Sequence, residues 1–82
     1  PRPLLIVEDD RTIAENLYEY LEARGHQCDY ADSIAAASAL LARSAFDAVV
    51  LDRNLPDGDG LDFIRDIRQW SPVPIIVLSA PQ

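Results

Sequence analysis

One stretch decides the fold of this chain: VVLDRNLPDGDG, residues 49–60. Its apolar beginning is continuous and β-branched rather than alternating, which predicts a strand over Ala48–Leu51 that is buried on both faces. The strand stops at Asp52, and a loop rich in Asp, Gly and Pro follows. Asp52 would then lie at the carboxyl end of a central strand, where open α/β sheets bind ligands. An Asp before such a loop can also simply begin a turn, so residues upstream must decide between a site and a turn.

Strands alternate with helices along the rest of the chain. Mostly apolar runs predict three further strands, at Leu4–Val7, Gln27–Ala31 and Pro74–Ser79. Apolar residues at helical spacing predict three helices, over residues 11–24, 34–42 and 60–70. This order, strand–helix–strand–helix–strand–helix–strand, predicts a parallel sheet with helices on both faces, a three-layer α/β fold.

Single residues at the helix ends support these boundaries. Asp10 and Ser33 are expected to be N-caps, and Gly25 is expected to end the first helix in the left-handed conformation. The third helix is expected to bury one face, formed by Leu61, Ile64, Ile67 and Trp70.

Composition limits the classes of function. The chain has 82 residues, enough for one small domain, and 14 acidic against 7 basic residues give a net charge of −7. This balance argues against binding of a nucleic acid backbone by this segment and is compatible with a cation site. Cys28 is the only cysteine, so no internal disulfide can form, and a reducing cytoplasm is the expected location. No apolar run approaches the roughly 20 residues that cross a membrane.

Acidic residues gather where the predicted strands end. Glu8 and Asp9 follow the first strand, Asp52 ends the third, and Ser79 ends the fourth, so all four should meet at one sheet edge. Carboxylates in one pocket repel each other and are stabilised by a cation. Oxygen ligands with positions left for water favour Mg²⁺ over Ca²⁺. Asp52 could then act as a nucleophile and form an aspartyl phosphate, with the Ser79 hydroxyl near a phosphoryl oxygen.

Three rival motifs do not fit the sequence. An EF-hand loop that begins at Asp52 fails because Pro56 takes a ligand position and Phe63 replaces the closing Glu. The Gly-rich dinucleotide fingerprint is absent after the first strand. A phosphatase that hydrolyses an aspartyl phosphate needs a general acid beside its nucleophile, and Asn54 cannot supply the proton.

Three segments taken together resemble a known family. They are LIVEDD at residues 5–10, VVLDRNLPDGDG at 49–60, and PIIVLSA at 74–80. In this order and spacing the whole chain resembles the receiver domain of a two-component response regulator, and most closely the OmpR/PhoB group, whose members carry a DNA-binding winged helix. The resemblance implies a flavodoxin-like sheet in which the strands lie in the spatial order second, first, third, fourth.

The resemblance also implies a role for each site residue. Asp52 would accept a phosphoryl group from a sensor histidine kinase. Asp9 and Asp52 would bind Mg²⁺ through their side chains and Asn54 through its backbone carbonyl, while Glu8 would complete the acidic pocket through a water molecule. Two further roles fall at the end of the fourth strand: Ser79 would be the switch hydroxyl, and the small Ala80 would leave access to the acceptor.

The chain departs from the family at its end. It stops at Gln82, before the fifth strand with its Lys, the switch aromatic residue and the last two helices of a receiver. We therefore expect residues 1–82 to be the N-terminal part of a receiver domain, with no effector domain. The uncharged fourth strand would be a bare edge, which predicts a homo-oligomer that forms through it.

The function expected from the sequence is that of a bacterial, cytoplasmic phosphoacceptor which is not an enzyme beyond phosphorylating and dephosphorylating itself. Two alternatives remain open. One is a metal-dependent phosphohydrolase of related topology, and the other is a degenerate receiver-like interaction module that takes no phosphate.

Overall fold

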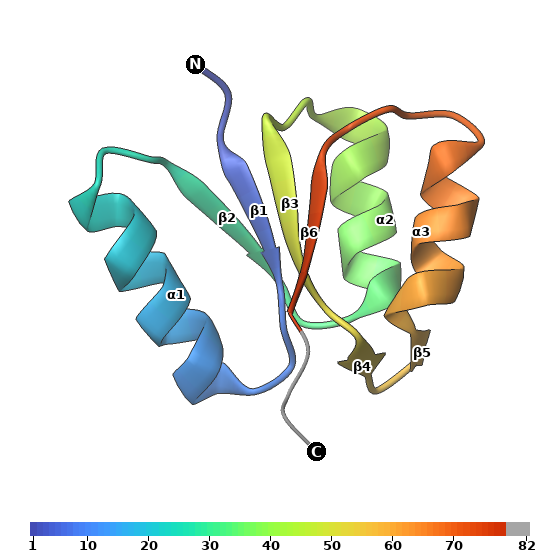
Figure 1. Cartoon of the computed structure of the whole chain (residues 1–82), viewed down its shortest axis with the longest axis horizontal. Helices are drawn as coiled ribbons and strands as arrows, with labels where there is room; N and C mark the ends of the chain where they lie inside the picture. The colour runs from blue at the N-terminus through green and yellow to red at the C-terminus, as the bar shows by residue number, and fades with distance from the viewer. Residues whose placement is uncertain (79–82) are drawn as a thin grey trace.

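A computed structural model of the chain describes residues 1–78 (Figure 1). The elements in chain order are β1 Leu4–Val7, α1 Arg11–Ala23, β2 Cys28–Ala31, α2 Ile34–Arg43, β3 Ala48–Asp52, β4 Asn54–Leu55, β5 Gly58–Asp59, α3 Gly60–Arg68 and β6 Ile75–Leu78. No helix in the described part of the chain is long and apolar enough to cross a membrane.

Within residues 1–78, four parallel strands form the central sheet in the order β2-β1-β3-β6. This is the order predicted from the sequence, with β6 as the fourth long strand. One row across the sheet shows the register: Ile6 pairs with Val50, and Val50 pairs with Ile76. Helix α1 lies apart from α2 and α3, which lie side by side (Figure 1).

The two sides of the sheet carry separate apolar clusters. Helices α2 and α3 pack on one side against the odd-numbered positions of the central strands, such as Leu5 and Leu51, both of which are fully buried. Helix α1 packs on the other side against Ile6 and Cys28. Helices therefore cover both faces, which confirms the predicted three-layer arrangement.

The two predicted N-caps and the left-handed Gly25 are confirmed, whereas the helices end at Ala23, Arg43 and Arg68 instead of at residues 24, 42 and 70. The Asp10 side chain accepts a hydrogen bond from the backbone N–H of Ile13, and the Ser33 hydroxyl accepts one from Ala36, each at 3.1 Å. Gly25 has a φ of 89°, a left-handed conformation that side-chain-bearing residues rarely adopt.

The buried face of α3 differs from the prediction. Phe63 is 2% exposed and packs in the core, whereas Leu61 and Trp70 are 36% and 53% exposed. The buried positions Gly60, Phe63 and Ile67 follow the spacing of one helical face, and Leu61 lies to the side of it. Trp70 lies beyond the helix, which ends at Arg68, so it does not continue that face.

The loop after β3 contains a short hairpin that the sequence did not predict. Strands β4 and β5 pair antiparallel, with Asn54 opposite Asp59 and Leu55 opposite Gly58. Leu55 is 9% exposed and belongs to the larger apolar cluster, so the hairpin is anchored in the core. The loop that follows the acceptor candidate Asp52 is therefore a folded element.

Strand β6 begins at Ile75, one residue later than predicted. Pro74 has no N–H to donate, but its carbonyl accepts a hydrogen bond of 2.8 Å from the N–H of Val49. Ile76 and Val77 are 56% and 38% exposed, because β6 is an outer strand of the described sheet.

Candidate acidic site at the carboxyl edge of the sheet

Pairing of two central strands brings the acidic residues together. Val7 of β1 lies opposite Leu51 of β3, so the next residues, Glu8 and Asp52, emerge side by side at the carboxyl edge. One carboxylate oxygen from each of Glu8, Asp9 and Asp52 lies within 4.8 Å of the others. The predicted convergence of these three carboxylates is present in the structure.

The three carboxylates differ in burial. Glu8 is 3% exposed, Asp52 is half-buried, and Asp9 is exposed. Burial, together with the neighbouring Asp52 carboxylate, raises the pKa of Glu8 from its ordinary value to about 7. The backbone N–H of Asp10 donates a hydrogen bond of 3.2 Å to Glu8 Oε2 and opposes this rise.

The donor set fits a hard divalent cation. All three side chains offer oxygen, the donor atom that hard divalent cations prefer. The arginines that form ion pairs within residues 1–78 do so elsewhere, with Glu15, Asp59 and Asp62 as their partners. A cation bound here would offset the repulsion between the three carboxylates.

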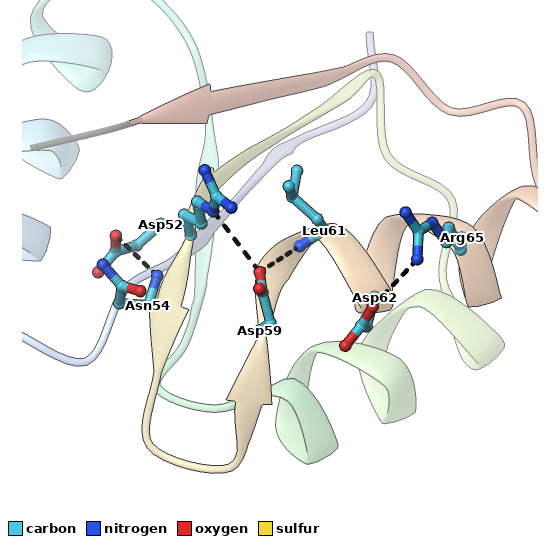
Figure 2. A network of polar contacts seen from close by, with 7 residues as sticks. Asp52, Asn54, Asp59, Leu61, Asp62 and Arg65 are labelled. Atoms are coloured by element: carbon cyan, nitrogen blue, oxygen red, sulfur yellow. Dashed lines mark hydrogen bonds and ion pairs between the residues drawn. The ribbon is translucent and has the colours of Figure 1, made fainter.

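Asn54, the first residue of the hairpin, lies two residues after the acceptor candidate Asp52. Its backbone N–H donates a hydrogen bond of 3.3 Å to Asp52 Oδ1, so the main chain at Asn54 holds the carboxylate (Figure 2). Ser79 and Ala80, which sequence reasoning also placed at this edge, lie outside the described residues.

The far side of the hairpin is fixed to α3. Asp59 caps the helix by accepting a hydrogen bond of 2.9 Å from the N–H of Leu61, and it forms an ion pair with Arg53 at 3.8 Å (Figure 2). The N–H of Gly60 donates to the Arg53 carbonyl at 2.6 Å. A Cβ atom on Gly60 would lie 2.9 Å from the carbonyl oxygen of Asp52, so only glycine allows this close approach.

Sequence reasoning missed the contact made by Asp57. Its two carboxylate oxygens accept hydrogen bonds of 2.8 and 3.0 Å from the N–H groups of Ile34 and Ala35, at the start of α2. One signal could have indicated this contact. In a parallel sheet the helices begin at the edge where the strands end, so the unpaired N–H groups of α2 had to lie near the loop after β3.

Comparison with known proteins gives consistent matches. The family described as response regulator receiver domain matches residues 4–82. The KDP operon transcriptional regulatory protein KdpE of Escherichia coli (strain K12) is 47% identical over 77 residues, which cover 94% of this chain and 34% of that protein. The transcriptional regulatory protein VxrB of Vibrio cholerae is 39% identical over 94% of this chain and 31% of its own length. The chain thus spans about a third of the length of these curated relatives.

Solved structures agree with this result. The MaeR response regulator bound to beryllium trifluoride superposes with a TM-score of 0.92 at 35% identity, covering 100% of this chain and 70% of that one. The non-phosphorylated HemR receiver domain from Leptospira biflexa gives a TM-score of 0.85 at 37% identity, covering 98% of this chain and 65% of that one. Both similarities confirm the flavodoxin-like receiver architecture predicted from the sequence.

Proposed function

Because the chain belongs to the response regulator receiver domain family, we propose that it is the phosphoacceptor segment of a two-component system and that Asp52 is the acceptor. One observation carries the proposal: Asp52 ends a central strand, half-buried, with the carboxylates of Glu8 and Asp9 within 4.8 Å. A lone turn-forming Asp would need neither neighbour.

The chemistry assigned to Asp52 is nucleophilic attack. One carboxylate oxygen forms a bond to the phosphorus of the donor while the bond from phosphorus to the donor's leaving group breaks, and an aspartyl phosphate results. The Asn54 N–H, already donated to Oδ1, keeps the carboxylate in one orientation during the approach. Because the Asn54 side chain is an amide, it offers no acid proton for hydrolysis, which favours a phosphoryl group that persists.

Mg²⁺ is the proposed cofactor of this reaction. Asp9 and Asp52 would hold it by side chain and Asn54 by its backbone carbonyl, with Glu8 acting through water. When bound, the ion would neutralise the carboxylates and the oxygens of the incoming phosphoryl group. The three oxygen donors within 4.8 Å of one another support this assignment.

The proposed donor is a sensor histidine kinase, and the proposed output of the whole protein is control of transcription. The proposed control of transcription is inferred from the curated relatives, which are named transcriptional regulatory proteins. Ser79 as switch hydroxyl and Ala80 as the residue that leaves access remain proposals from the family resemblance. No role as an enzyme acting on other molecules is proposed.

Incubation of the full chain with acetyl phosphate and Mg²⁺, followed by mass spectrometry, tests the function. We expect one phosphoryl group on Asp52, none on the Asp52→Asn variant, and normal labelling of Asp29→Asn, which removes an exposed carboxylate from β2. Steady release of phosphate from a phosphate ester would instead indicate a phosphohydrolase. No labelling and no turnover would indicate an interaction module.

A further inference from the structure

A single carboxylate joins the β4–β5 hairpin to the start of α2. Asp57 contacts Ile34 and Ala35 across 23 and 22 residues of sequence, at 2.8 and 3.0 Å. Both bonds are charge-assisted, since a carboxylate accepts from backbone N–H groups that carry the positive end of the helix dipole. We call this pair of hydrogen bonds the tie between the hairpin and α2.

Capping of α2 does not by itself explain this tie. Ser33 already caps the helix in the ordinary way, because its hydroxyl accepts from the N–H of Ala36. Asp57 reaches the helix from another part of the chain, so it constrains the hairpin as much as it caps the helix.

The hairpin leads directly to the acceptor candidate. Its first residue, Asn54, donates its N–H to Asp52 Oδ1 at 3.3 Å and lies opposite Asp59 in the β4–β5 pair. Only Arg53 separates Asp52 from the hairpin, and its carbonyl is held by the N–H of Gly60. A displacement of the hairpin would therefore reach the Asp52 carboxylate through the Asn54 N–H.

We propose that Asp57 is a positioning residue for the phosphoacceptor: by tying the hairpin to α2, it fixes the Asn54 N–H and thereby the orientation of the Asp52 carboxylate. The proposal rests on the function proposed above for Asp52. It adds a residue that lies outside the acidic cluster of Glu8, Asp9 and Asp52.

The test compares two variants of the same helix start in the full chain. Asp57→Ala removes the tie, whereas Ser33→Ala removes the local cap and leaves the hairpin contact in place. Both should lower the unfolding midpoint. Only Asp57→Ala should slow phosphorylation of Asp52 by acetyl phosphate, by roughly tenfold, because small misplacements of reacting groups have large effects on rate. Asp57→Asn keeps one acceptor oxygen, so its rate of Asp52 phosphorylation should lie between those of wild type and Asp57→Ala.

A second readout does not depend on phosphorylation. Hydrogen exchange of the Asn54 amide should become faster in Asp57→Ala and stay unchanged in Ser33→Ala. If Asp57→Ala and Ser33→Ala showed equal exchange of the Asn54 amide, or equal rates of Asp52 phosphorylation, Asp57 would act only as a helix cap. Either result would overturn the proposal. If the wild-type chain is not phosphorylated, the proposed function of Asp52 is wrong. Hydrogen exchange of the Asn54 amide then tests by itself whether Asp57 fixes the Asn54 N–H. If Asp57→Ala does not fold, the comparison is made with Asp57→Asn.

Discussion

Asp57 Oδ1 accepts a hydrogen bond of 2.8 Å from the backbone N–H of Ile34, 23 residues earlier in the chain. This bond, followed by the one from Ala35, holds the pKa of the Asp57 carboxyl below its ordinary value. The ionised form is thus favoured in the folded state, and the stability of the domain becomes linked to pH through this residue.

The first prediction follows from the direction of that shift. A group with a lowered pKa contributes stability that is fully present above its unfolded pKa, near 3.9. That stability is lost as the pH falls through the still lower folded value. The difference in urea midpoint between wild type and Asp57→Asn should therefore be largest near neutral pH and shrink below about pH 4. Ser33→Ala removes a neutral group from the same helix start, so its difference from wild type should not change with pH. A pH-independent effect of Asp57→Asn would contradict the assignment.

The second prediction concerns the glycine that begins α3. Alanine is the better helix former, but a Cβ at Gly60 would lie 2.9 Å from the Asp52 carbonyl oxygen and 3.0 Å from the Arg53 Cα, both backbone atoms. Gly60→Ala should therefore lower stability and shift the amide resonances of Asp52 to Asn54.

Gly25→Ala is the matched control. A Cβ there meets nothing within 4 Å, but the φ of 89° disfavours alanine by roughly 1–2 kcal/mol. This variant should lose stability and leave the resonances of the acceptor loop unchanged. Wild-type resonances at Asp52 in Gly60→Ala would show that the loop does not depend on the close approach.

The third prediction separates two neighbouring carboxylates. Asp9 belongs to the acidic cluster, whereas the Asp10 side chain caps α1 through the N–H of Ile13. Calorimetric titration with Mg²⁺ should show weaker binding for Asp9→Asn. Asp10→Asn should bind as wild type does, because Asn and Asp are comparable N-caps. Equal Mg²⁺ affinity in all three proteins would remove Asp9 from the proposed metal ligands.

The parts of the fold that the sequence predicted depend on local signals. Caps such as Asp10 and Ser33 act on their own helix, and apolar runs such as Ala48–Leu51 mark strands without reference to any partner. The acidic cluster was predictable for a related reason. Once the strands are parallel, residues that follow them must share one edge, whatever the details of packing.

The parts that were missed depend on contacts distant in sequence. Strands β4 and β5 have two residues each, too few for any periodicity to appear. The contact of Asp57 with Ile34 depends on where a hairpin and a helix start meet in space. Burial of Phe63 in place of Leu61 depends on how α3 is rotated against the sheet, and both residues are apolar. Tertiary packing decides such cases.

The last prediction concerns the two outer strands of the sheet that residues 1–78 form. Of the two, β2 includes the charged Asp29, whereas β6 has no charged residue and exposes Ile76 at 56%. An uncharged apolar edge is a template for pairing with another chain. A polypeptide of residues 1–82 should therefore form a dimer or a larger oligomer through β6.

Light scattering coupled to size exclusion over a dilution series measures the oligomeric state. Ile76→Lys places a charge on the edge strand and should shift the population towards monomer, since strands are protected from pairing in this way. Tyr20→Lys is the control, because the Tyr20 side chain on α1 is 55% exposed and lies away from the edge strand. This variant changes the net charge by the same amount as Ile76→Lys and should leave the oligomer intact. A folded monomer at every concentration would contradict the prediction, and an oligomer that persists in Ile76→Lys would locate the contact on another surface.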